Sequence, residues 1–180
     1  LSASVPSEKC FIKTASGACA PLVDTRSGKL YVCNQFAGTI SEIDRKGKLV
    51  AEHDIFGGAF SSLELRDGNL LLPCGDKHYY IIVDRKTGKE LKRVTSDDIK
   101  GASFWFVAQV LQLNNGNLLI CNWDGHTRGA VVDVPQLIEI DGDGKVVWTL
   151  NNKQDIDKVS AAFPFARFEI ENTFWMCVIF

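Results

Sequence analysis

The chain has 180 residues, of which 46% are apolar and 23% are charged, and its formal net charge is −2. This apolar fraction suffices for a sizeable core, so the composition excludes an intrinsically disordered chain. The near balance of 20 basic and 22 acidic residues argues against a nucleic-acid-binding protein and against a polybasic membrane anchor. The longest uninterrupted apolar run, Phe174–Phe180, is much shorter than the about 20 residues of a membrane-spanning helix. We therefore expect no nucleic-acid partner and no membrane span.

Three stretches repeat one pattern: an apolar strand, a polar turn that contains glycine, and a second apolar strand that carries a cysteine. They are Ala18–Asn34, Ala59–Gly75 and Ala108–Asn122. The pattern recurs about every 40 to 50 residues, which is the period of a repeat architecture built from small sheets.

Each stretch continues with a third strand that ends in aspartate before a glycine-containing turn, and then with a fourth strand. The third strands are Thr39–Asp44, Tyr80–Asp84 and Gln136–Asp141, and the fourth are Leu49–His53, Glu90–Val94 and Val146–Leu150. Aspartate accepts backbone hydrogen bonds in such turns, and glycine takes the positive φ. Four short strands per unit predict an all-β fold, a β-propeller of four-stranded antiparallel blades. A β-sandwich is the alternative, but it has no reason to repeat this order three times.

The predicted blades span about residues 15–54, 55–98 and 99–150, and residues 159–180 predict the first two strands of a fourth. Propellers typically have 4–8 blades, and the chain begins at Leu1, so we expect a fragment of a larger propeller with about three and a half blades present. In the alternative, Lys9–Lys13 pairs with the last half blade and closes a four-bladed ring. The apolar C-terminal edge strand would also allow self-association.

The chain has six cysteines, and no two of them have the C-x-x-C spacing of a zinc ribbon or a thioredoxin-type site. They are Cys10, Cys19, Cys33, Cys74, Cys121 and Cys177. Most lie within apolar runs, where cysteine behaves as a small buried hydrophobic residue. One or more disulfides is the alternative.

The turns Asp84–Lys89 and Asp141–Trp148 resemble the pyrroloquinoline-quinone-type (quinoprotein-like) propeller repeat. In that repeat a tryptophan docks one blade on the next, and Trp148 stands at its place. The segments Leu113–His126 and Pro135–Trp148 are similar to secreted, uncharacterised bacterial quinoprotein-like propellers, and more weakly to arylsulfotransferase propellers. The resemblance implies an extracytoplasmic (periplasmic or secreted) location. Nothing resembles the cofactor-binding residues of quinoprotein dehydrogenases, so no cofactor is expected.

Two loops of neighbouring units, Cys74–His78 and Cys121–His126, place an Asp-x-His sequence after the second strand. Loops at one end of a propeller converge on its central channel. The predicted ligand-binding residues are therefore Asp76, His78, Asn122, Trp123, Asp124 and His126. Turn capping and strand tying explain the same aspartates and histidines without a ligand. Two histidines and two carboxylates would also suit a divalent metal or a proton-transfer pair, but we favour the other roles and expect no metal site.

These observations favour a non-catalytic binding or scaffolding propeller that recognises a small molecule, glycan or protein at its channel-end loops. The alternative is a propeller enzyme, an arylsulfotransferase-like transferase or a hydrolase, with His78 or His126 as nucleophile or general base. An enzyme predicts an exposed histidine whose ring is oriented by a carboxylate. A scaffold predicts histidines that are satisfied by neighbouring strands. The aromatic run Phe104–Phe106 is predicted to be buried between blades.

Overall fold

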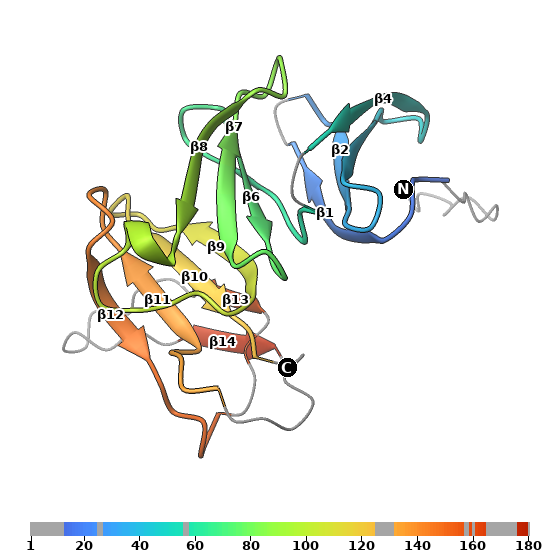
Figure 1. Cartoon of the computed structure of the whole chain (residues 1–180). Helices are drawn as coiled ribbons and strands as arrows, with labels where there is room; N and C mark the ends of the chain where they lie inside the picture. The colour runs from blue at the N-terminus through green and yellow to red at the C-terminus, as the bar shows by residue number, and fades with distance from the viewer. Residues whose placement is uncertain are drawn as a thin grey trace, which may run out of the picture.

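The computed structural model describes residues 13–24, 27–55, 58–124, 132–156, 159, 161–164 and 176–179. Within these residues the chain forms three four-stranded antiparallel sheets and one two-stranded sheet (Figure 1). In each sheet, strands that are neighbours in the sequence are also neighbours in space, which is the up-and-down order of a propeller blade. The predicted all-β propeller fold is therefore confirmed. No helix in the described part of the chain is long and apolar enough to span a membrane.

The four sheets follow one another along the chain. The first blade has β1 (Ala18–Val23), β2 (Leu30–Asn34), β3 (Thr39–Ile43) and β4 (Leu49–Asp54). The second blade has β5 (Leu63–Glu64), β6 (Leu70–Cys74), β7 (Tyr79–Val83) and β8 (Glu90–Thr95), followed by the 3₁₀ helix η1 (Ser96–Asp98). The third blade has β9 (Val107–Gln112), β10 (Leu118–Asn122), β11 (Leu137–Ile140) and β12 (Val146–Leu150). The two-stranded sheet pairs β13 (Ala161–Pro164) with β14 (Met176–Ile179).

Aspartate side chains hold the turns between the third and fourth strands, as the sequence predicts. Asp44 Oδ1 accepts hydrogen bonds from the Lys46 and Lys48 amides at 2.8 and 2.9 Å. Asp84 Oδ1 accepts from the Thr87 amide and hydroxyl, both at 2.8 Å. The Lys48 amide lowers the pKa of Asp44, and the Thr87 hydroxyl lowers that of Asp84. Each turn is therefore held by the hydrogen bonds of its own aspartate, which fix the register of the hairpin.

The core consists of layers between consecutive blades, because the middle strands are buried on both faces. Leu72 and Cys74 of β6 pack in the layer shared with the first blade. Leu71 of the same strand packs in the layer shared with the third blade, together with Ile120 of β10. A third layer joins the third blade to Ala162 of β13. Alternate residues of one strand thus stabilise two different interfaces, as blade stacking requires.

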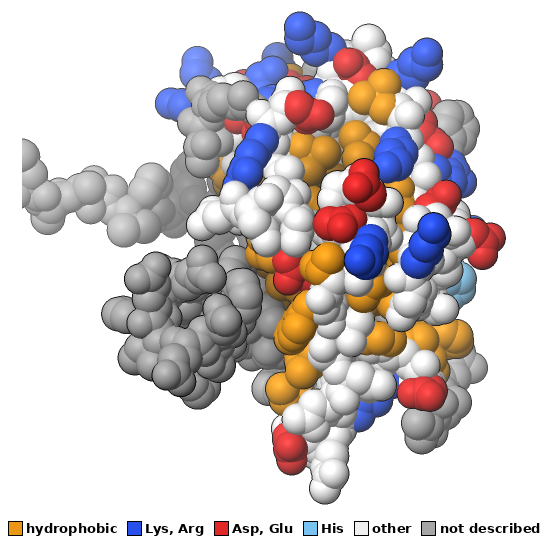
Figure 2. All heavy atoms as spheres, turned by 90° about the vertical axis from the view of Figure 1, so that its left-hand side faces the viewer, with side chains coloured by type: hydrophobic (Ala, Val, Ile, Leu, Met, Phe, Trp, Pro, Cys, Tyr) orange, Lys and Arg blue, Asp and Glu red, His pale blue; other side chains and the backbone are white. Residues whose placement is uncertain are grey.

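The outermost strands of the blades are exposed and keep some apolar side chains at the surface. Leu91 is 52% exposed on β8, and Trp148 is 41% exposed on β12. Trp148, which resembles a blade-docking tryptophan, therefore lies outside the described core layers. Figure 2 shows this side of the molecule, where basic and acidic side chains are interspersed with apolar ones.

The innermost strand of the second blade is shorter than the sequence predicts. The repeat predicts a strand from Ala59 onward, but β5 contains only Leu63–Glu64. The residues before it make other contacts: within the second blade, the Phe60 amide donates to the Pro73 carbonyl of β6 at 2.7 Å. The Ser61 hydroxyl donates to the Ala108 carbonyl of β9 at 2.7 Å. This segment therefore links the second blade to the third instead of extending a strand.

Several predictions fall partly on residues outside the described set. Residues 9–12 of the proposed closing strand and His126 of the predicted site lie outside it. The hairpin β13–β14 falls within the expected half blade 159–180. Its outer edge carries no further strand among the described residues, and self-association through this edge stays a prediction.

Cys33, Cys74 and Cys121 are buried free thiols, as predicted. Burial raises the pKa of each from 9.0 to about 12. Between about pH 9 and about pH 12, these thiols are deprotonated in the unfolded chain but stay protonated in the folded chain. The free energy of unfolding should therefore fall as pH rises from about 9 to about 12, by up to about 1.4 kcal/mol per pH unit for each thiol.

This pH dependence can be measured by urea unfolding at about pH 8 and about pH 10. The substitution Cys74→Ala should make the decrease smaller, because one titrating thiol is removed. A decrease of the same size in the wild type and the variant would contradict the assignment of this effect to the buried thiols.

Candidate functional site

The predicted site residues that the structure describes lie where the second strand of the second and third blades leads into the third strand. After β6, the Lys77 amide donates to the Cys74 carbonyl at 2.8 Å, and the His78 amide donates to the Gly75 carbonyl at 3.0 Å. This tight turn gives His78 a φ of 59°, and no other non-glycine residue in the described part of the chain has a positive φ. A non-glycine residue with a positive φ is strained and persists only where the surrounding structure holds it in that conformation. Such residues cluster at functional sites.

The imidazole of His78 is fixed against Trp105, which belongs to the connection between η1 and β9. Its Nδ1 hydrogen-bonds the Trp105 main-chain oxygen, and the two ring centroids are 5.6 Å apart at an interplanar angle of 45°. A carbonyl oxygen can only accept, so Nδ1 carries the proton. In the neutral ring, Nε2 is then an acceptor. His78 is exposed and Trp105 is half-buried, so the structure presents an imidazole of defined tautomer beside an indole.

Asn122 is buried and supports this arrangement from the interior. Its Oδ1 accepts a hydrogen bond from the Trp105 amide at 2.6 Å. Its Nδ2 donates to the carbonyls of Ser103 and Pro135, each at 3.0 Å. Both amide hydrogens are therefore used within the protein. Asn122 is therefore a positioning residue for Trp105.

Trp123 and Asp124 follow β10 at the same end of the third blade. Trp123 is half-buried, and its ring lies edge-on to Phe106 at 5.2 Å between centroids. Asp124 is 8% exposed, and its Oδ2 forms an ion pair with Lys153 Nζ at 2.9 Å. Its Oδ1 has no hydrogen-bond partner within the described structure.

Asp76, Asp124 and His78 each contact a residue outside the predicted set. Asp76 is exposed, and its Oδ2 lies 3.5 Å from Gln35 Nε2 in the β2–β3 turn of the first blade. Asp124 pairs with Lys153, and His78 bonds a carbonyl oxygen. His126 lies outside the described residues. Among the residues that the structure describes, no group of three His, Cys, Asp or Glu side chains could hold a metal ion.

The aromatic run that the sequence predicts to be buried contains two buried residues and one half-buried residue. Phe104 and Phe106 are 5% and 2% exposed and pack in two different core layers. Trp105 between them is only half-buried. Trp105 lies at a bend and packs partly against the core layer that contains Phe106, and nothing in the sequence of the aromatic run distinguishes it from its two neighbours.

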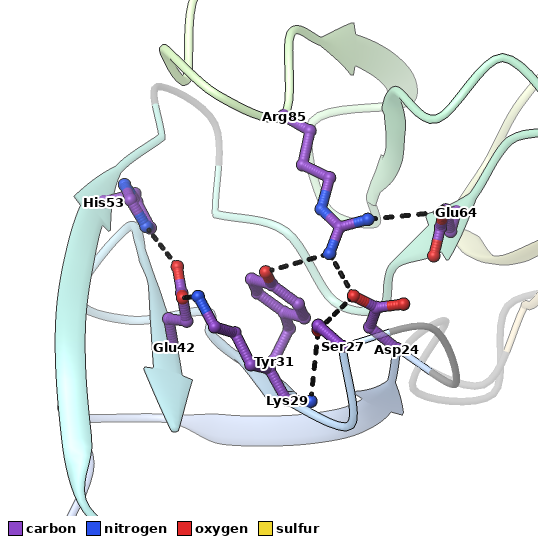
Figure 3. Close-up of polar contacts among 8 residues, drawn as sticks. All are labelled: Asp24, Ser27, Lys29, Tyr31, Glu42, His53, Glu64 and Arg85. Carbon is purple, nitrogen blue, oxygen red and sulfur yellow. Dashed lines mark hydrogen bonds and ion pairs between the residues drawn. The ribbon is translucent and has the colours of Figure 1, made fainter. Parts of the chain in front are cut away.

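A second polar cluster joins the first and second blades at their other end (Figure 3). Arg85, from the β7–β8 turn, forms an ion pair with Asp24, which is 2% exposed. Its Nη1 lies 3.3 Å from Glu64 Oε1, and its Nη2 lies 3.3 Å from the Tyr31 hydroxyl. Ser27 donates a further hydrogen bond to Asp24. One guanidinium thus links the β7–β8 turn and β5 of the second blade to β2 and the β1–β2 turn of the first blade.

Glu42 is the centre of a smaller group on the first blade, also drawn in Figure 3. Its carboxylate contacts Lys29 and lies 3.2 Å from His53 Nε2. Burial alone would raise the pKa of Glu42, but the hydrogen bonds from Lys29 and His53 outweigh it and lower the pKa. His53, on the outermost strand β4, keeps 35% of its side chain exposed.

The stacked sheets and their turns define the protein as a β-propeller. The chain belongs to the Mal s 1 allergenic protein-like family, whose model matches residues 16–145. It is similar to a crystal structure of a protein of unknown function from Bacteroides caccae, with 35% identity and a TM-score of 0.71. This match covers 80% of the present chain and 53% of that structure, so the chain spans about half the length of its solved relative.

More distant solved structures show the same fold. A gluconolactonase from Xanthomonas campestris matches with 10% identity and a TM-score of 0.55, over 72% of this chain and 46% of its own. The calcium-binding protein regucalcin from Agrobacterium tumefaciens matches with 14% identity and a TM-score of 0.53, over 84% and 47%. No curated protein matches the sequence. These matches show a propeller fold, and they do not confirm the resemblance to quinoprotein repeats.

Proposed function

We propose that this chain is part of a propeller that binds a small molecule or glycan, without catalysing a reaction. The proposed site is the blade end that carries His78, Trp105 and Trp123. The exposed imidazole of fixed tautomer beside Trp105 is the observation that carries the proposal. An indole offers an apolar face, and Nε2 of the neutral imidazole offers an acceptor for a hydroxyl or amide. Small-ligand sites combine such apolar surface with a few placed polar groups.

Contacts between neighbouring turns support one continuous surface across the three blades. Gln35 of the first blade reaches Asp76 of the second at 3.5 Å. Phe106, which precedes β9, packs so closely on Gly75 that a β-carbon there would lie 2.2 Å from its Cζ. The same Phe106 ring contacts Trp123. A ligand that covers His78 and Trp105 would therefore have polar turn residues on one side and Trp123 on the other.

A hydrolase or an arylsulfotransferase-like transferase is the second candidate function. The same hydrogen bond favours it, because a protonated Nδ1 leaves Nε2 as the site of a general base. The orienting group is the Trp105 carbonyl oxygen and not the carboxylate that the enzyme hypothesis predicts. Gluconolactone hydrolysis is the assay that the fold relatives suggest. Turnover by the wild type that is lost in His78→Ala would favour this candidate over a binding protein.

An extracytoplasmic location and a quinoprotein-like type of repeat are part of the same proposal. The location is supported by the similarity of Leu113–His126 and Pro135–Trp148 to secreted propellers, and the type of repeat by the resemblance of Asp84–Lys89 and Asp141–Trp148. Cell fractionation tests the location: recovery of the natural protein in the cytoplasm alone would exclude it.

Ligand binding should be weakened by His78→Ala and by Trp105→Leu. The probe is a panel of monosaccharides, short oligosaccharides and heteroaromatic fragments, screened by saturation-transfer NMR. For the panel members that bind the wild type, loss of the imidazole should weaken binding by about tenfold, because one hydrogen bond contributes about 1.4 kcal/mol.

The control is His53→Ala, since His53 lies on β4 and contacts Glu42 at 3.2 Å, away from the proposed site. It should leave binding unchanged, and circular dichroism should show that all three variants are folded. The proposal fails if no panel member binds the wild type, or if His78→Ala binds as tightly as His53→Ala does.

A further inference from the structure

Cys19 is the one described cysteine that the repeat pattern does not explain. Cys33, Cys74 and Cys121 occupy the second strands of the three blades. Cys19 lies on β1 instead, and the strand register places it directly opposite Cys33. Opposite residues of antiparallel strands point to the same face, with their Cα atoms about 4.5–5.5 Å apart. That separation falls within the range of about 4.4–6.8 Å found across disulfides.

The third blade shows that side chains at this pair of positions reach each other. There Gln109 of β9 lies opposite Cys121 of β10, and the Cys121 thiol contacts Gln109 Oε1 at 3.7 Å. In the first blade, the Cys19 sulfur lies 3.5 Å from the main-chain oxygen of Cys33. Both Cys19 and Cys33 are free thiols in the structure. The first blade thus has a cysteine pair where the third has a glutamine and a cysteine.

We propose that Cys19 and Cys33 are a site of reversible oxidation, at which a peroxide converts the two thiols to an intrachain disulfide. Cys19 is half-buried, whereas Cys33 has no exposed surface. The peroxide therefore reacts first at Cys19.

The reaction balances in two steps. The Cys19 sulfur attacks the peroxide O–O bond, which gives a sulfenic acid and one water molecule. The Cys33 sulfur then displaces the sulfenic hydroxyl, the S–S bond forms, and a second water molecule leaves. The two thiols lose two electrons and two protons, and hydrogen peroxide is reduced to water.

Oxidation would change the contact between the first two blades. The Cys19 thiol donates a hydrogen bond to the Phe60 carbonyl at 2.9 Å, and Phe60 belongs to the segment that leads into β5. A disulfide removes this donor. Burial also raises the pKa of both thiols, so the reaction should be slow near neutral pH and faster in alkaline solution.

The test treats the whole native chain with hydrogen peroxide, then unfolds it in an alkylating reagent and maps the peptides by mass spectrometry. The expected product is a peptide pair joined through Cys19 and Cys33, lighter by two hydrogen atoms and restored by a reductant. Cys19→Ser should abolish this product, whereas Cys121→Ser should leave it unchanged. Gln109→Cys should add a second bridge, to Cys121, because it reproduces the same cross-strand pair in the third blade.

Three results would overturn the proposal. One is a native chain in which both Cys19 and Cys33 stay alkylatable after peroxide treatment. Another is a bridge between Cys33 and Cys74, which pack in the same core layer. The third is a bridge that forms only after unfolding, since this would show that the folded register does not bring the thiols together.

Discussion

Replacing Gly75 with alanine is expected to lower the free energy of unfolding by about 3 kcal/mol, because the added methyl group overpacks the interface between the second and third blades. The three atoms nearest to the position of a β-carbon all belong to the Phe106 ring, at 2.2 to 2.6 Å. Phe106 is 2% exposed and makes edge contacts with both Phe60 and Trp123. The ring cannot move aside without disturbing these two neighbours. Urea unfolding of Gly75→Ala and the wild type measures the loss.

Gly142→Ala is the matched control, because a β-carbon at Gly142 meets nothing within 4 Å and its φ is not in the left-handed region. Its stability should stay within about 0.5 kcal/mol of the wild type. In the double variant Gly75→Ala with Phe106→Leu, the smaller side chain should recover part of the loss, so that the two substitutions are not additive. Additive losses, or a Gly75→Ala variant as stable as Gly142→Ala, would show that the Phe106 ring does not set the cost.

The fold could be predicted from the sequence because each blade is specified by local signals. Asp44, Asp84 and Asp141 end alternating strands and are followed by glycine turns, and each caps its own turn through nearby amides. Such contacts span a few residues and are readable in the sequence. The repeat also carries a signal of side-chain packing between blades. Gly75 replaces the asparagine found at Asn34 and Asn122, which indicates that another side chain fills the space there.

The contacts that build the candidate site were not predictable in this way. The His78 imidazole bonds a main-chain oxygen 27 residues further along the chain, and a repeat alignment does not compare these two positions. Asn122 was expected to face a ligand, but an asparagine at a strand end is equally able to hold a neighbouring segment, as it holds Trp105. The ion pair between Arg85 and Asp24 joins residues 61 apart in the sequence. Pairings of this kind depend on how consecutive blades stack, and no local pattern encodes that.

Replacing Arg85 with alanine is expected to destabilise the protein by about 3–5 kcal/mol, which is the usual cost of removing one partner of a buried ion pair. Asp24 is 2% exposed, so its carboxylate would stay in the interface between the first two blades without its guanidinium. Glu64 and the Tyr31 hydroxyl would lose the same partner. Arg85→Lys should recover only part of the stability, because one ammonium cannot bond all three groups in the geometry of the planar guanidinium. Thermal or urea unfolding measures each variant.

Arg93→Ala provides a matched control on the same blade. Arg93 also contacts a carboxylate and an aromatic ring, since its Nη2 lies 2.7 Å from Glu90 Oε2 and its guanidinium lies 4.3 Å from the centre of the Tyr79 ring. The difference is that Arg93 and Glu90 are exposed, with 41% and 36% of their side chains accessible to solvent. Water can replace an exposed partner, so this substitution should cost at most about 1 kcal/mol. Equal losses in Arg85→Ala and Arg93→Ala would contradict the view that the buried Asp24 carboxylate makes Arg85 the principal polar link between the first two blades.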